Sequence, residues 1–267
     1  MLKHTLVPLL LLSTACGAPS GSSATASINL TAVNSSPQAL VAAPHGADAG
    51  GGVFTLTSAK AYIRDVRLYL PHEKSCDGVP QTAEAVGPRS DADGQVAGLT
   101  CDGNHTIHIR GPFLVDLLSG QAPEGLTSVV LPATTYRRVD VRLDKAEPAD
   151  GVVAATDPLA GNTLQASGTY AYNGASTPFS LSLRFNEDAR FEDPNGMSLA
   201  AGLASTVMLH LDVNAWFSNL PVAECQGKGD LTTDNGTLII ADGHGSCSNI
   251  ENSLKDAIEA SAKLAVH

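Results

Sequence analysis

The chain is poor in charged and aromatic residues. Charged residues make up 16% of its 267 residues and aromatic residues 4%, and the net charge is −11. This shortage of basic residues argues against a DNA or RNA partner, because binding to phosphates requires a basic surface. The sequence also has no H-E-x-x-H, Walker or G-x-G-x-x-G motif. These absences favour an exported β-protein with few charged and aromatic residues over a nucleotide-dependent enzyme or a nucleic-acid-binding protein.

No apolar run reaches the roughly 20 residues of a transmembrane helix, and the longest hydrophobic segment lies at the N-terminus. A short basic start, the apolar residues 6–12 and a small-residue segment predict a signal peptide over residues 1–15. Cys16 follows directly, which resembles the lipobox of bacterial lipoproteins, although Ser13 stands where a Leu is usual. The resemblance implies a diacylated Cys16 and a cell-envelope location, with ordinary secretion as the alternative. Gly17, rather than Asp, after the cysteine favours the outer membrane.

The four remaining cysteines are Cys76, Cys101, Cys225 and Cys247. An even number in an exported chain predicts two disulfides, for which three pairings are formally possible. We favour Cys76–Cys101 and Cys225–Cys247, because each pair brackets a Gly- and Asp-rich stretch typical of a loop. A four-cysteine metal site is the alternative, but the sequence has no C-x-x-C pair.

Residues 16–26 are predicted to be an anchor cysteine followed by a flexible Gly/Ser/Ala tether, and residues 27–267 a single domain. The predicted fold class is mainly β, an antiparallel β-sandwich or barrel, because many short alternating runs are separated by Gly, Pro, Asn and Asp turns. In residues 59–70 the alternation slips by one after Asp65, which predicts a β-bulge or two abutting strands. Strands are expected at residues 27–33, 54–56, 59–70, 105–110, 113–118, 126–131, 136–143, 164–172, 178–185, 206–213 and 237–241.

Two segments have helical rather than alternating patterns. Residues 214–219 are predicted to form one short turn. Residues 248–266 are predicted to form a C-terminal amphipathic helix, since Ile250, Leu254 and Ile258 share one stripe. Such a helix would cover one open end or face of the sandwich.

Three of the predicted strands carry a family resemblance. They read AKAYIRDVRLYLP at residues 59–71, FLVDLLSG at 113–120 and LPATTYRRVDVRL at 131–143. This series resembles a family of bacterial lipoproteins with a transthyretin/prealbumin-like domain of unknown function, over roughly residues 53–213. A more distant resemblance, carried by residues 211–217, is to the MbnP family of periplasmic partners in copper handling. The resemblances imply an antiparallel β-sandwich of transthyretin- or immunoglobulin-like type, and they imply no particular reaction.

The candidate metal ligands are His210, Asp212, Asp242 and His244. His210 and Asp212 share one face of a predicted strand, because side chains two residues apart point the same way. Asp242 and His244 lie in a Gly-rich loop before the C-terminal helix, where binding residues are common. If the loop approaches the strand, these four side chains could hold a divalent metal; a solvated sheet face and a simple Gly-rich turn are the alternatives.

Other polar groups give weaker signals. His105 and His108 should lie on opposite faces of a strand and could bind one ion only if the segment turns, so we interpret them as polar strand residues. Acidic residues at 91–94, 187–188 and 192–193 could offer oxygen atoms to calcium, but none completes the calcium-loop pattern. We interpret them as solvated acidic turns. No nucleophile elbow is present around Ser246.

The sequence therefore predicts a non-enzymatic, envelope-anchored lipoprotein that acts as a binding or scaffold module. Its partners would be the membrane, through the N-terminal lipid, and a protein or small ligand that the sequence does not identify. No cofactor is expected. The alternative function is a periplasmic or outer-membrane metal-binding protein for Cu, Zn or Ca.

Overall fold

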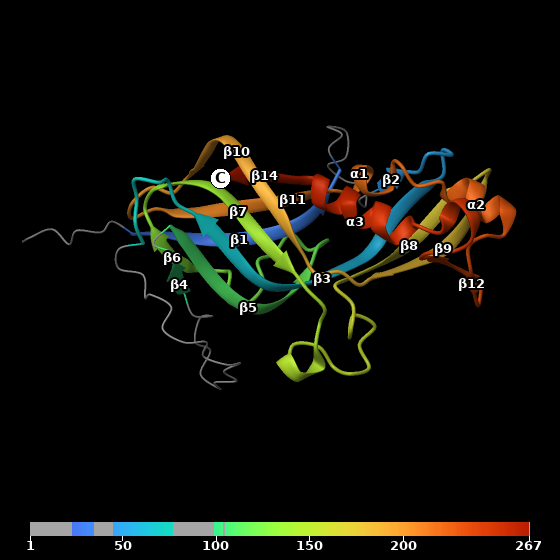
Figure 1. The fold of residues 1–267 in the computed structure, drawn as a ribbon, viewed down its shortest axis with the longest axis horizontal. Helices are drawn as coiled ribbons and strands as arrows, with labels where there is room; N and C mark the ends of the chain where they lie inside the picture. The colour runs from blue at the N-terminus through green and yellow to red at the C-terminus, as the bar shows by residue number, and fades with distance from the viewer. Residues whose placement is uncertain (1–22, 35–44, 77–98, 104, 267) are drawn as a thin grey trace, which may run out of the picture.

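The computed structural model describes residues 23–34, 45–76, 99–103 and 105–266. Cys16, the predicted signal peptide and the acidic segment 91–94 lie outside these residues. The described part is mainly β, as predicted, and forms a β-sandwich-like arrangement of two sheets with a helix near the C-terminus (Figure 1). None of its helices has the length and apolar character needed to cross a membrane.

The smaller sheet has four strands, in the order β14 (Ala262–Val266), β11 (Ala204–Asp212), β1 (Ser23–Val33) and β6 (Val129–Pro132). The larger sheet runs β10 (Glu187–Ser198), β7 (Thr135–Leu143), β3 (Val53–Tyr69), β8 (Leu164–Tyr172), β9 (Ala175–Leu183), β13 (Thr237–Ile240) and β12 (Thr233–Asp234). In addition, β2 (His45–Ala47) and β5 (Thr106–Asp116) pair with β3, and β4 (Leu99–Asp102) pairs with β5. Most pairs are antiparallel, but β1 with β11 and β9 with β13 are parallel.

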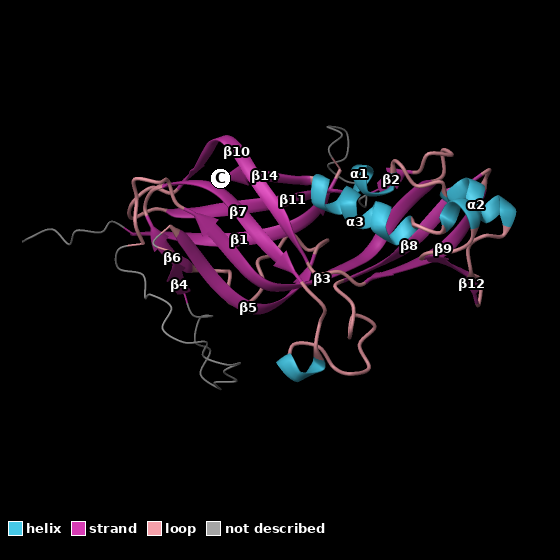
Figure 2. Ribbon diagram, viewed as in Figure 1, coloured by secondary structure: helices cyan, strands magenta, loops and turns pink. Residues whose placement is uncertain are grey.

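Strand β3 is 17 residues long and belongs to both halves of the molecule. Its first half pairs with β2 and β8, and its second half pairs with β5 and β7. The register shifts between Ile63 and Asp65 on both sides of β3, which confirms the bulge predicted from the slip in alternation. Figure 2 shows this strand running from the sandwich into the helix-covered half.

One hydrophobic core joins the two sheets. Leu30 and Leu209 of the smaller sheet belong to the same buried cluster as Leu68 and Val139 of the larger one. Both predicted disulfides, Cys76–Cys101 and Cys225–Cys247, are present and their sulfur atoms are buried with this core.

Three helices gather over one side of the sheet half that contains β8 and β9 (Figure 2). They are α1 (Val213–Phe217), α2 (Val222–Lys228) and α3 (Ile250–Ala260), with single 3-10 turns at Pro148–Asp150 and Gly245–Cys247. Helix α3 packs against α1 and β10 through its buried stripe of Ile250, Leu254 and Ile258. The apolar stripe of this helix is therefore the one that the sequence predicts.

The prediction of a helix over residues 248–266 is wrong beyond Ala260. The Ser261 hydroxyl donates to the Ile258 carbonyl (2.6 Å) and accepts from the Trp216 indole N–H (3.2 Å), so it is held at the helix end. The next five residues form β14, which pairs with β11. Alternating small and apolar residues fit a strand as well as a helix, and the available edge of β11 decides between them.

The predicted tether over residues 16–26 is also too long, because β1 begins at Ser23. Ala24 and Ala26 are buried against the core. A segment rich in small residues has the composition of a linker. Ala24 and Ala26 are nevertheless two residues apart on a strand, so both side chains point toward the core. The domain therefore starts four residues earlier than predicted.

Candidate functional site

The outward face of the larger sheet carries a regular array of charged side chains, which we call the checkerboard face. Side chains alternate along a strand, so the residues between the buried ones point away from the core. These outward residues are Asp65, Arg67 and Tyr69 of β3; His108 and Arg110 of β5; Arg138, Asp140 and Arg142 of β7; and Asp188, Arg190 and Glu192 of β10.

The strand register places opposite charges next to each other across the sheet. One row across β5, β3, β7 and β10 reads Arg110, Asp65, Arg142 and Asp188. The next row reads His108, Arg67, Asp140 and Arg190. Across β3, β7 and β10 charges therefore alternate both along the strands and between them, the arrangement in which cross-strand pairs stabilise a sheet. Figure 1 shows β10, β7, β3 and β5 side by side in the sandwich half.

Arg67 lies at the centre of this array and contacts two carboxylates. Its Nε is 2.9 Å from Asp65 Oδ1, and its two terminal nitrogens donate to Asp188 at 2.8 and 3.1 Å. Arg142 also reaches Asp188, at 3.5 Å. A guanidinium that forks onto a carboxylate is held in one orientation, so this part of the face is rigid.

Asp140 is the most buried charged residue of the face, with only 2% of its surface exposed. Arg138 Nη2 lies 3.2 Å from Asp140 Oδ2, and Arg190 Nε lies 3.7 Å from Oδ1. Burial raises the pKa of Asp140 above its usual value, although Arg138 opposes this effect. The Arg138 guanidinium also covers the Tyr69 ring at 3.8 Å from its centroid. The face thus surrounds one buried carboxylate with cations.

We expect His108 to make the stability of the protein depend on pH. Burial is the main cause that lowers the pKa of His108 below its usual value, and Arg67 and Arg110 add to it. An unfolded histidine takes up its proton near pH ~6.5, so below that pH the unfolded chain binds more protons at this position. The contribution of His108 to stability is therefore present above pH ~6.5 and decreases as the pH falls toward its folded pKa.

The measurement for this prediction is chemical denaturation of wild type and His108→Gln between pH ~5 and pH ~7.5. The wild type should lose stability relative to the variant as the pH falls. Parallel curves for wild type and His108→Gln would contradict the prediction.

The structure places His210 and Asp212 on β11, on the face opposite the buried Val207, Leu209 and Leu211, as predicted. The Asp212 carboxylate accepts from the Asn214 backbone N–H (3.1 Å) and so caps α1. Its second oxygen lies 3.3 Å from the Lys263 ammonium of β14. Asp212 therefore joins a helix start to a neighbouring strand.

Asp242 and His244 have different surroundings from the β11 pair. Asp242 Oδ1 accepts from the Glu251 backbone N–H (2.9 Å), and Glu251 Oε1 accepts from the Asp242 N–H (3.4 Å), which secures the first turn of α3. His244 is exposed, and its backbone N–H donates to the Asp230 carbonyl (3.2 Å). Within the described residues, no three His, Cys, Asp or Glu side chains come together as a possible metal site.

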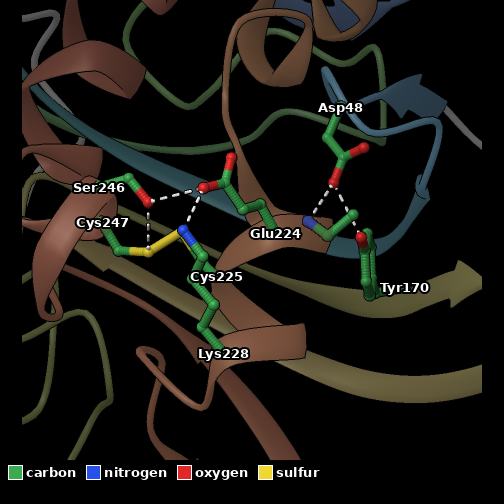
Figure 3. The surroundings of a disulfide bond; sticks show 8 residues. Asp48, Tyr170, Glu224, Cys225, Lys228, Ser246 and Cys247 are labelled. Carbon is green, nitrogen blue, oxygen red and sulfur yellow. Dashed lines mark hydrogen bonds and ion pairs between the residues drawn. A yellow bond between two sulfur atoms is a disulfide. The ribbon is translucent and has the colours of Figure 1, made fainter.

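A second polar cluster lies around Asp48, near the Cys225–Cys247 disulfide (Figure 3). Asp48 is 6% exposed and accepts four hydrogen bonds. The Gly50 and Gly52 N–H groups donate to Oδ1 at 2.9 and 2.7 Å, and the Tyr170 hydroxyl and the Ala223 N–H each donate to Oδ2 at 2.8 Å. This cluster attaches the loop after β2 to β8 and α2.

Close packing in this cluster explains one of the three consecutive glycines of the loop. A Cβ atom on Gly52 would lie 2.1 Å from the Tyr170 hydroxyl oxygen. Only glycine therefore lets the chain pass between Asp48 and Tyr170. The sequence alone gives no sign of the buried Asp48 carboxylate beside these glycines.

The checkerboard face was also missed at the level of sequence, although its signal is present. The segments Asp65–Tyr69, Arg138–Arg142 and Asp188–Glu192 place a charged or aromatic residue at alternate positions, with the sign usually changing at each step. The acidic pairs at 187–188 and 192–193, interpreted above as turns, belong to β10. Asp188 contacts Arg67 and Arg142, Glu192 lies 3.9 Å from Arg190, and Glu187 lies 2.8 Å from Lys255.

Comparison with known proteins found no relative of this chain. No protein-family model, curated protein or solved structure matches the chain. The checkerboard face and the contacts of the individual side chains are therefore the basis on which a function is proposed.

Proposed function

We propose that the chain is an exported lipoprotein, attached to the cell envelope through Cys16, that acts non-enzymatically as a binding or scaffold module. The checkerboard face is the surface that meets the partner. This face is the observation that carries the proposal. Two intact disulfides support an exported location, since such bonds persist in oxidising compartments.

The chemistry of the face favours a protein partner that is itself polar. Arginine and tyrosine are the side chains that contribute most energy at protein interfaces, and Arg67, Arg138, Arg142 and Tyr69 are all on this face. The three arginines are held by ion pairs and Tyr69 by its contact with the Arg138 guanidinium, so little side-chain freedom is lost on binding. Because positive and negative charges nearly balance, the face selects a matching pattern at contact rather than attracting one sign of charge at a distance.

The test compares cross-linking from two exposed positions in living cells. A photo-crosslinking amino acid replaces Arg190 on the checkerboard face or, as the matched control, Lys228 on α2. Position 190 should give a discrete adduct that is lost when Arg142→Glu is added, while position 228 should give none. Equal adducts from both positions, or an adduct insensitive to Arg142→Glu, would contradict the binding role of the face.

The anchor is tested in the same cells by labelling with palmitate. Wild type should carry the label and sediment with membranes. Cys16→Ala should lose both the label and membrane attachment while still cross-linking from position 190 in soluble extracts. Membrane attachment of Cys16→Ala would show that the anchor is assigned to the wrong residue.

A further inference from the structure

Two uncharged segments flank the first residues of β1. Residues 125–136 and 197–209 contain no Asp, Glu, Lys, Arg or His. They include β6 with the turn that follows it, and the turn between β10 and β11 with the first part of β11.

The structure brings these two segments together around the first residues of β1. On one side Ser23 is opposite Pro132 and Thr25 is opposite Val130. On the other side the Gly202 N–H donates to the Ser23 carbonyl at 2.9 Å, and the Thr25 N–H donates to the Leu203 carbonyl at 3.2 Å. The start of β1 therefore lies between the two uncharged segments.

Apolar side chains are exposed at this end. Among the described residues, the large hydrophobic side chains that are exposed are Val53, Val130 and Leu203, at 37%, 59% and 60%. Val130 and Leu203 flank Thr25, and the neighbouring Ala200, Ala201 and Ala204 are exposed as well. Exposed apolar side chains gathered in one place are typical of a surface that meets an apolar environment.

In the sequence, only a short segment separates the predicted anchor from this end. Residues 17–22 separate Cys16 from Ser23, and none of them is charged. A chain extends by at most about 3.6 Å per residue, so an acylated Cys16 would hold Ser23 within roughly 25 Å of the bilayer. The end that carries Val130 and Leu203 is then the part of the domain that is nearest to the lipid.

We infer that this end, marked by Val130, Ala201 and Leu203, docks on the surface of a phospholipid bilayer. The inference rests on the lipid anchor of the proposed function. Two large apolar side chains are too few to hold the protein on a membrane, and one or two acyl chains supply that attachment. The docked end adds orientation: the sandwich is held with its β1 end toward the lipid, and α2, at the opposite end in Figure 1, points away.

The experiment uses the mature acylated protein bound to phosphatidylcholine vesicles that contain a small fraction of nitroxide-labelled headgroup lipid. A fluorescent amino acid is placed at Ala201 or, as the control position, at Lys228. Quenching at position 201 should exceed quenching at position 228 by at least about threefold, because nitroxide quenching requires near contact. Equal quenching at both positions in vesicle-bound protein would overturn the inference and leave the anchor intact.

Two variants separate the docking surface from the anchor. Val130→Glu combined with Leu203→Glu should reduce quenching at position 201 to the level at position 228, with the protein still bound to vesicles. The matched control is Val53→Glu, which changes the third exposed hydrophobic residue and should leave the quenching unchanged. Failure of the wild type to float with vesicles would instead refute the anchor, and the docking inference with it. Self-association of unacylated protein that Val130→Glu with Leu203→Glu abolishes would assign this end to a second copy and overturn the inference.

Discussion

Replacing Asp48 by alanine is expected to lower the free energy of unfolding by about 4 kcal/mol. The Asp48 carboxylate accepts four hydrogen bonds from the Gly50, Gly52 and Ala223 N–H groups and the Tyr170 hydroxyl. Without it, these donors remain buried and lose their acceptor, which costs about 1–3 kcal/mol for each group that water cannot reach. The cavity left by the side chain adds to the loss.

Two further variants test whether the effect comes from the hydrogen bonds. Asp48→Asn keeps one acceptor oxygen but turns donor hydrogens toward the Ala223 N–H, so its stability should lie between that of wild type and Asp48→Ala. Tyr170→Phe removes one of the four donors and should cost about 1 kcal/mol. Urea denaturation followed by fluorescence of the single tryptophan, Trp216, measures all three. A loss below 1 kcal/mol for Asp48→Ala would show that the carboxylate does not secure the loop.

Removing the Cys225–Cys247 disulfide by alanine substitution at both positions is expected to cost about 3 kcal/mol. The two cysteines are 22 residues apart in the chain, and the cross-link limits the freedom of the unfolded loop between them. Both cysteines are fully buried, so each substitution also removes packed atoms. Thermal denaturation should show a lower midpoint, and reduction of the wild type should approach the midpoint of the variant.

The matched control for this experiment is the other disulfide, Cys76–Cys101, whose separation of 25 residues predicts nearly the same entropic effect. The two disulfides should differ in their coupling to Asp48. Cys225 and Ala223 belong to the same helix, α2, and Ala223 donates to Asp48. Losses from Asp48→Ala should therefore be non-additive with removal of Cys225–Cys247 and additive with removal of Cys76–Cys101. Additivity in both combinations would mean that α2 does not link the two features.

The elements that sequence predicts well are those whose signal is local. Strand β8 has the predicted bounds, because alternation ends at the Asn173-Gly174 turn, where both residues have positive φ. The two disulfides follow from even cysteine number and short spacing. The bulge in β3 follows from the slip in its alternation, which is also a property of neighbouring residues.

The elements that sequence misses depend on partners that are distant in the chain. The parallel pairing of β1 with β11 joins Ile28 to Val207, and neither segment alone indicates it. Strand β10 contains four acidic residues, Pro194 and Gly196, which are typical of a loop, but Ala189 and Phe191 are buried and Asp188 contacts Arg67. The candidate site was missed for the same reason. The charged residues are visible in the sequence, but only the strand register shows that their signs alternate across the sheet.

The long strand β3 has a consequence for how the protein unfolds. Because its first half pairs with β2 and β8 and its second half with β5 and β7, opening either half removes hydrogen bonds from a strand that the other half needs. The two halves therefore form one cooperative unit, with the slowest amide exchange expected near Ala61 in the middle of the strand. A partner that binds the checkerboard face would accordingly protect the helix-covered half as well, which links binding at one end to the lifetime of the whole fold.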